Sequence, residues 1–112
     1  LHYKVIYFCE KEDAEIVQQR ISKINEMIER IFKNINITFI KINHELKDWE
    51  QMLAMSLCED NIIANSSFSW WGAYINDNPE KIVTYPSIWF GPAMTDKNVS
   101  DLFPKQWKRI QL

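Results

Sequence analysis

Short apolar segments alternate with stretches of helical periodicity along this chain, and this order limits its possible folds more than any other feature. Four segments are rich in β-branched or aromatic residues, and we expect strands at Tyr3–Phe8, Asn36–Ile42, Asn61–Ala64 and Ile82–Tyr85. We expect helices at Asp13–Lys33, Asp48–Cys58 and Ser67–Asn76, and only a short turn or helix at Lys105–Ile110. Strands that alternate with helices predict parallel pairing through right-handed crossovers. The expected fold is an α/β three-layer domain with a mostly parallel sheet of about four strands, formed by residues 1–112 as one unit.

The composition excludes several classes of protein. A chain of 112 residues with 46% hydrophobic and 25% charged residues is neither disordered nor fibrous. Its net charge of −2 argues against a dedicated nucleic-acid binder, which would usually present a basic face. Cys9 and Cys58 lie in apolar runs without a C-x-x-C pair, and the two histidines lack the spacing of ligands, so we expect free thiols and no metal.

The sequence also shows no membrane-length apolar stretch and no signal peptide. With the free thiols, this favours a cytoplasmic protein. Because the chain begins with Leu1, it resembles a fragment, and a lumenal protein anchored upstream of these residues is the alternative. A fragment would leave an apolar inter-domain face exposed, so we also expect association with itself or with a partner.

The most informative stretch is Asn61–Asn76, sixteen consecutive residues without a charged side chain. The first N–H groups of a helix have no backbone partner, and most helices place Asp or Glu in that turn. Here the turn offers Ser66, Ser67 and Ser69, and it follows a strand that ends at Ala64-Asn65. Uncharged donors at this edge of a sheet are typical of a phosphate site.

A purely structural interpretation of the same stretch stays open. Ser66 or Ser67 would be an ordinary N-cap, and Phe68, Trp70 and Trp71 would belong to the core. Gly72 inside the helix costs about 1 kcal/mol relative to alanine, and close packing of the helix backbone against a neighbour is the simplest explanation. In the preceding helix, spacing predicts an apolar face that carries Trp49, Met52, Leu53 and Leu57.

The run NIIANSSFSWWGAYIN, preceded by MSLC at Met55–Cys58, resembles the C-terminal signature of α-1,2-fucosyltransferases, glycosyltransferase family 11. The resemblance continues through KIVTYPSIWFGP at Lys81–Pro92 and DLFPKQWKRI at Asp101–Ile110. It implies one Rossmann-like half of a GT-B-like enzyme. Such an enzyme transfers L-fucose from GDP-β-L-fucose to a sugar hydroxyl with inversion and without a metal or other cofactor.

The resemblance also assigns residues. It implies that the diphosphate of GDP lies against Asn65, Ser66, Ser67, Phe68 and Ser69, whose hydroxyl and N–H groups stabilise the leaving group. The family's guanine-reading Asp falls at Gln51, with Glu50 beside it, so we expect these two residues near the base. Asp13 is a further candidate for the base or ribose, with a solvated turn charge as the alternative. Trp70 and Trp89 are candidates for a sugar pocket, and core packing is the alternative for both.

No catalytic residue can be assigned from this chain: His44-Glu45 could act as a general base, with a surface loop as the alternative. The family's His-x-Arg motif, whose arginine contacts the donor phosphates, is absent. We therefore expect a donor-binding half that is inactive alone and that meets its carbohydrate acceptor through a separate N-terminal half. The alternative is a stand-alone Rossmann-like nucleotide- or sugar-binding module without transferase activity.

Overall fold

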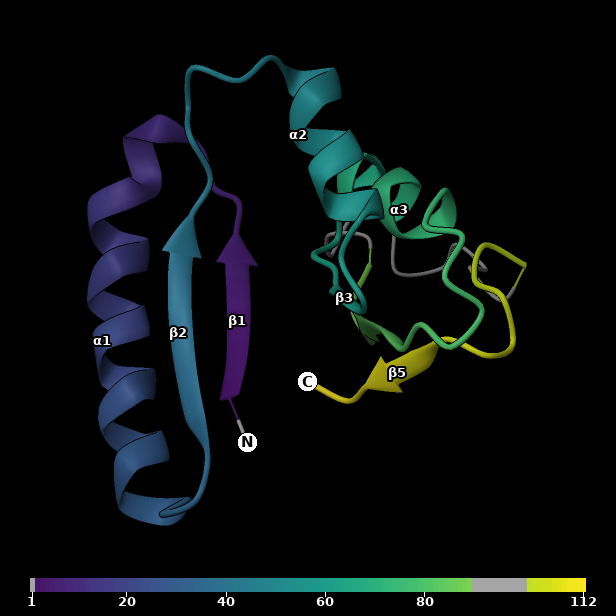
Figure 1. The fold of residues 1–112 in the computed structure, drawn as a ribbon. Coiled ribbons are helices and arrows are strands. Elements are labelled where there is room, and N and C mark those ends of the chain that lie inside the picture. The colour runs from purple at the N-terminus through teal and green to yellow at the C-terminus, as the bar shows by residue number, and fades with distance from the viewer. Residues whose placement is uncertain (1, 90–100) are drawn as a thin grey trace. The chain divides into compact units, whose positions relative to one another are not determined.

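The computed structural model describes residues 2–89 and 101–112, which fall into two compact units, Leu1–Lys47 and Asp48–Leu112 (Figure 1). The α/β class and the parallel pairing of strands are confirmed in both units. The number of strands differs from the prediction, because the described residues form five strands in two sheets instead of about four in one. That the two units join into a single domain stays a prediction.

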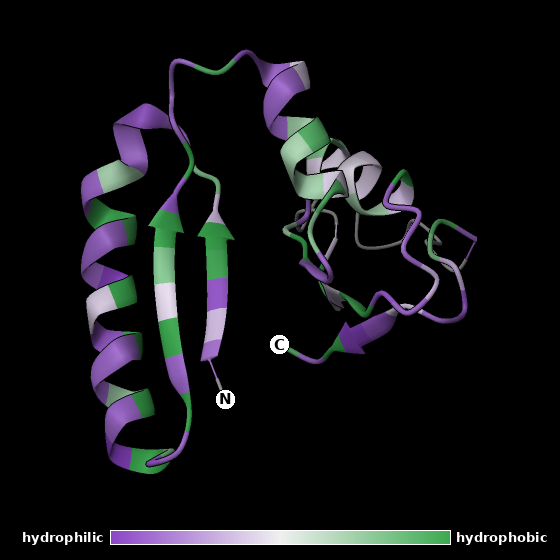
Figure 2. Cartoon of the chain, viewed as in Figure 1, coloured by the Kyte–Doolittle hydropathy of each residue, from purple (hydrophilic) through white to green (hydrophobic). Residues whose placement is uncertain are grey.

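The first unit is a strand–helix–strand crossover. β1 (His2–Tyr7) is followed by a 3-10 turn, η1 (Lys11–Asp13), by α1 (Ala14–Ile31) and by β2 (Asn36–Lys41). The two strands pair in parallel, from His2 beside Asn36 to Tyr7 beside Lys41. Figure 2 shows polar residues along the outer side of α1, as expected for a helix with one apolar face.

The second unit contains α2 (Asp48–Ser56), β3 (Asn61–Ile62), α3 (Ser67–Tyr74), β4 (Val83–Pro86) and β5 (Lys108–Ile110). Its strands are all parallel, in the order β3-β4-β5. The prediction of a turn or helix at Lys105–Ile110 is wrong for the last three residues, which form β5. They become a strand because β4 offers a free edge, where Thr84 lies beside Lys108 and the Ser87 N–H donates to the Ile110 carbonyl at 2.8 Å.

The core of the second unit is largely aromatic. Ile63, Ala73, Val83 and Trp107 are its buried members, and four half-buried aromatic residues pack against them: Trp70, Tyr85, Trp89 and Phe103. The rings of Tyr85 and Phe103 stack with their centroids 3.9 Å apart. The side of α3 that carries Ala73 is therefore held against the β3–β4–β5 sheet by large, rigid side chains.

Helices α2 and α3 approach each other closely at Gly72. A Cβ atom built on Gly72 would lie 2.8 Å from the Met55 sulfur and 2.9 Å from the Met55 Cβ. The packing role expected for Gly72 is confirmed. The apolar face expected on α2 does not make this contact: Met55 and Ser56 are buried, while Trp49, Leu53 and Leu57 are exposed.

We expect Gly72→Ala to destabilise the protein by about 1–2 kcal/mol, although alanine favours a helix by about 1 kcal/mol. The new methyl group would clash with the Met55 Cβ. Because a Cβ atom is fixed to the backbone, the clash is relieved only if α2 itself shifts. Denaturant unfolding of the wild type, Gly72→Ala, Met55→Gly and the double variant measures the coupling. A Gly72→Ala penalty that persists when Met55 is glycine would show that the contact is not its cause.

Both cysteines are free thiols, as expected. Burial raises the pKa of the Cys58 thiol, which donates to the Ala54 carbonyl with 3.4 Å between sulfur and oxygen. Within residues 2–89 and 101–112, no helix is both long and apolar enough to span a membrane.

Candidate functional site

The candidate site lies where β3 and β4 end. Because these two strands are parallel, the segments that follow them leave the sheet at the same edge. The segment after β3 enters α3 at Ser66, and the segment after β4 leads to Trp89. The Asn65 side-chain amide donates to the Trp89 carbonyl at 3.3 Å and joins the two segments. This edge therefore brings together all of the predicted diphosphate residues.

Ser66 is the N-cap of α3. Its backbone is extended, with φ −136° and ψ 141°, and its hydroxyl oxygen accepts the Ser69 N–H at 3.1 Å. The Trp70 N–H donates to the Ser66 carbonyl at 3.0 Å and begins the helical ladder. One part of the structural interpretation is therefore confirmed, because Ser66 caps the helix.

The Ser69 hydroxyl is turned inward. Ser69 is 8% exposed, and its hydroxyl oxygen lies 3.1 Å from each of two acceptors, the Ala64 carbonyl and the Ser66 carbonyl. Because these carbonyls share the only Ser69 hydroxyl proton, the Ser66 hydroxyl donates to the Ser69 oxygen, with 2.8 Å between the two oxygens. Both hydroxyl groups are engaged within the turn, and they fix its shape.

Ser67 and Phe68 present the open donors of the turn. Neither N–H has a hydrogen-bond partner within the described part of the chain, and the Ser67 side chain is exposed. The first turn of α3 carries no acidic residue, so no internal anion competes for the positive end of the helix dipole. This arrangement suits an anionic oxygen such as one of a phosphate.

Trp70 and Trp89 both take part in aromatic packing. The Trp70 indole N–H donates to the Leu102 carbonyl at 3.0 Å, and its ring stacks on Tyr74 with centroids 4.9 Å apart. The rings of Trp89 and Phe103 pack edge to face, with 5.0 Å between their centroids. Core packing accounts for the positions of both rings, and a sugar pocket at either of them stays a prediction.

The three residues predicted to read the base lie in different parts of the fold. Glu50 and Gln51 are half-buried in the first turn of α2, and both are in contact with neighbouring groups. Asp13 belongs to the first unit, where it precedes α1, is exposed and makes no side-chain cap. Their contact with a guanine base stays a prediction.

The sequence analysis did not anticipate a buried asparagine pair at the two ends of the uncharged run. The Asn76 amide, 3% exposed, donates to the Asn61 side-chain oxygen and to the Cys58 carbonyl, both at 2.8 Å. Asn61 in turn donates to the Met55 carbonyl at 2.8 Å. The pair ties the end of α2 and the start of β3 to the end of α3. The signal available in the sequence was one asparagine at each boundary of the run.

Lys81 caps the C-terminal end of α3 with its side chain. Its ammonium group donates to the Ala73 carbonyl at 2.7 Å and to the Asn76 carbonyl at 2.5 Å, where the helix dipole is negative. Burial lowers the pKa of Lys81, against the opposing effect of the nearby Asp77 charge. The helix therefore takes its C-terminal positive charge from a residue beyond its own last turn.

Comparison with known proteins identifies the family. The model of glycosyl transferase family 11 matches residues 2–111. The chain belongs to glycosyl transferase family 11. The predicted resemblance is confirmed, and the serine turn of α3 lies within the matched region.

Two relatives in this family come from Escherichia coli. The O-antigen biosynthesis glycosyltransferase WbnK is 35% identical over 105 residues, which are 93% of this chain and 33% of the relative. An alpha-1,2-colitosyltransferase is 37% identical over 107 residues, 96% of this chain and 33% of the relative. The chain therefore spans about a third of the length of these family 11 relatives. No solved structure matches the chain significantly.

Proposed function

We propose that this chain is the donor-binding part of an inverting family 11 fucosyltransferase. The reaction is transfer of L-fucose from GDP-β-L-fucose to a sugar hydroxyl in α-1,2 linkage. Family membership supports glycosyl transfer, and the name of the alpha-1,2-colitosyltransferase supports this linkage. We assign the carbohydrate acceptor to a separate N-terminal half and assign no catalytic base.

The observation that carries the proposal is the pair of N–H groups at Ser67 and Phe68, which have no hydrogen-bond partner among residues 2–89 and 101–112. When the bond between fucose and GDP breaks, negative charge develops on the diphosphate. Donors that are already fixed in place stabilise this charge without reorganising. The hydrogen bonds between Ser66 and Ser69 hold the turn in that arrangement before the donor arrives. The turn thus performs the task of a metal ion, and we propose a metal-independent reaction.

Guanine recognition is assigned to the first turn of α2. A carboxylate accepts hydrogen bonds from both the N1–H and the amino group of guanine, and neither uracil nor adenine offers that pair. Gln51 provides an amide where the family usually has Asp. Of the two carboxylates in this turn, Asp48 and Glu50, we assign the task to Glu50, which is adjacent to Gln51.

Thermal unfolding of the intact protein that contains these residues tests the donor class. We expect GDP to raise the melting temperature more than UDP, ADP or pyrophosphate, since a ligand at 100 times its Kd adds about 2.7 kcal/mol. In Glu50→Gln, the advantage of GDP over UDP should fall while the effect of pyrophosphate stays. Equal shifts with all four ligands, or none with GDP, would contradict the assignment.

Transfer itself is measured separately. The intact protein should release GDP from GDP-fucose in the presence of lactose and form a fucosylated product. GDP binding without such transfer, over a panel of galactosides, would favour the alternative of a nucleotide-binding module.

A further inference from the structure

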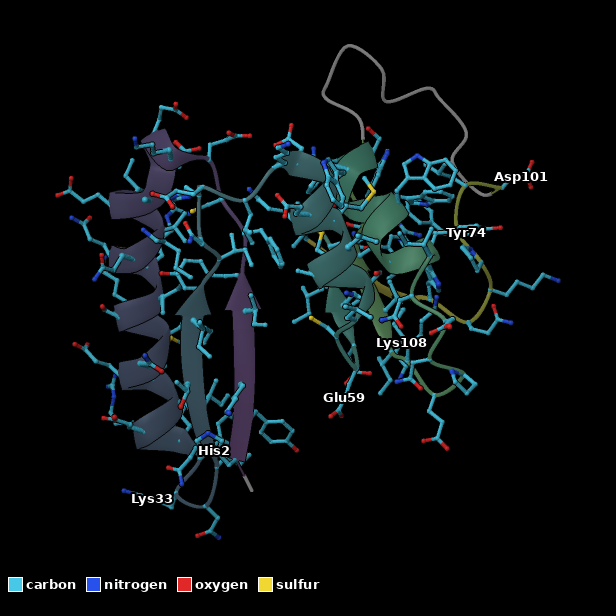
Figure 3. All side chains as sticks on the ribbon, turned by 45° about the horizontal axis from the view of Figure 1, so that its top comes forward. His2, Lys33, Glu59, Tyr74, Asp101 and Lys108 are labelled. Carbon is cyan, nitrogen blue, oxygen red and sulfur yellow. The ribbon has the colours of Figure 1, made fainter. Side chains whose placement is uncertain are left out.

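A cavity of about 340 Å³ lies at the end of α3 farthest from the serine turn. Tyr74, the last residue of α3, is labelled in Figure 3. It lines the cavity together with Trp107 and two prolines, Pro79 and Pro104. Ligand pockets usually enclose about 300–1,000 Å³, so this cavity suits a small ligand. All of its lining residues belong to the second unit.

The aromatic wall of this cavity is fixed in place. Tyr74 is 53% exposed, and one face of its ring stacks on Trp70 with an angle of 10° between the planes. Trp70 is held by its hydrogen bond to the Leu102 carbonyl. Its ring also packs against that of Trp107, with 5.9 Å between the ring centroids. A rigid wall loses little conformational entropy when a ligand binds.

The polar groups of the cavity are only partly engaged. Asp77 and Gln106 are exposed, and within the described ranges neither side chain makes a hydrogen bond. The Lys81 ammonium group, in contrast, already donates to the carbonyls at the end of α3. The Asp77 charge acts on Lys81 as well. The cavity thus offers hydrogen-bonding groups without a free positive charge, which disfavours a phosphate.

We propose that this cavity binds a neutral sugar unit, at a site separate from the serine turn. The C–H face of a pyranose packs on the face of an aromatic ring, here Tyr74. Its hydroxyl groups donate to the Asp77 carboxylate and exchange hydrogen bonds with the Gln106 amide. The inference does not depend on the identity of the nucleotide donor. It gives the family 11 chain a second contact with carbohydrate, at the opposite end of the same helix.

The test uses the intact protein labelled with [15N]tryptophan and titrated with lactose. We expect a saturable shift of the Trp107 indole N–H signal, assigned with Trp107→Phe, and no such shift with inorganic phosphate. In Asp77→Ala/Gln106→Ala the apparent Kd for lactose should rise at least about tenfold. Both residues are exposed, so the variant should keep the wild-type unfolding midpoint, and Glu59→Ala on the same unit is the matched control.

Three results would overturn the sugar site: no saturable shift with lactose, with L-fucose or with N-acetylglucosamine; the same affinity in the double variant; or a shift caused by phosphate. Addition of GDP separates this proposal from the donor site. GDP should leave the lactose-dependent Trp107 shift in place, whether or not GDP itself binds at the serine turn.

Discussion

Replacing Ser67 with proline is expected to lower kcat/KM for GDP-fucose by about 10- to 100-fold, the effect of losing one hydrogen bond to a charged group. Proline removes the backbone N–H at the first position of α3, and that N–H is one of the two open donors of the turn. The helix itself should persist. Proline is favoured at the first helical position, and Ser66 already has the extended backbone that precedes a proline.

Ser67→Ala is the matched control, since it removes the hydroxyl and keeps the N–H. Its kcat/KM should fall by less than tenfold. Steady-state kinetics with varied GDP-fucose, on the intact protein, gives the comparison, and circular dichroism checks the helix content. If Ser67→Pro keeps wild-type kcat/KM while folded, the diphosphate does not lie at this turn.

The largest loss of stability is expected for Asn76→Ala, about 3–4 kcal/mol. The substitution removes two hydrogen bonds donated by the side chain, to Asn61 and Cys58, and one accepted from the Asn78 N–H at 3.1 Å. It leaves the Asn61 side-chain oxygen buried without its donor. Denaturant unfolding midpoints measure the loss. Asp77→Asn, the exposed neighbour, should change stability by less than about 0.5 kcal/mol.

The Asn76→Asp variant tests whether Asn76 stabilises the protein through its hydrogen bonds or only through packing. An ionised carboxylate cannot donate, and it would lie beside the Asn61 oxygen, so its folded-state pKa should rise above the unfolded value of about 3.9. A group with a raised folded pKa destabilises the fold as pH rises through that pKa. The variant should therefore be most stable in acid and lose stability towards neutral pH. A penalty independent of pH would assign the role of Asn76 to packing alone.

Local sequence patterns predicted the helices and most of the strands. The apolar periodicity over residues 14–31 and the short β-branched runs do not depend on distant partners, and these elements lie where expected. β5 was missed because Lys108–Ile110 has no strand pattern of its own. It is a strand only through its pairing with β4, more than twenty positions earlier in the chain.

The contact face of α2 shows a second limit of pattern analysis. Spacing places four residues on one apolar face: Trp49, Met52, Leu53 and Leu57. Met52 is half-buried and the other three are exposed, while α2 contacts α3 through Met55. The closeness of that contact depends on the absence of a side chain at Gly72, one element later. The spacing of apolar residues within α2 cannot show that α3 has no side chain at the point of contact.

The sequence pattern singled out the turn at the start of α3 as the candidate site, but it could not rank the three serines of that turn. Ser66, Ser67 and Ser69 are equivalent by residue type, and only their positions relative to the first helical residue separate their tasks. The N-cap hydroxyl turns back towards the third residue of the helix, and that residue turns inward. The intervening position, Ser67, remains open. The exact start of the helix therefore decides which serine can meet a ligand.

The groups that hold α3 together lie almost entirely outside it. Its eight residues include Gly72 and four large aromatic residues of modest helix propensity. Its cap is Ser66, and its C-terminal positive charge comes from Lys81. A segment of this length does not hold a helix by itself in water. The shape of the serine turn therefore depends on the packing of α3 against α2 and the β3–β4–β5 sheet. We expect substitutions that loosen this packing to weaken the proposed binding of the donor diphosphate as well.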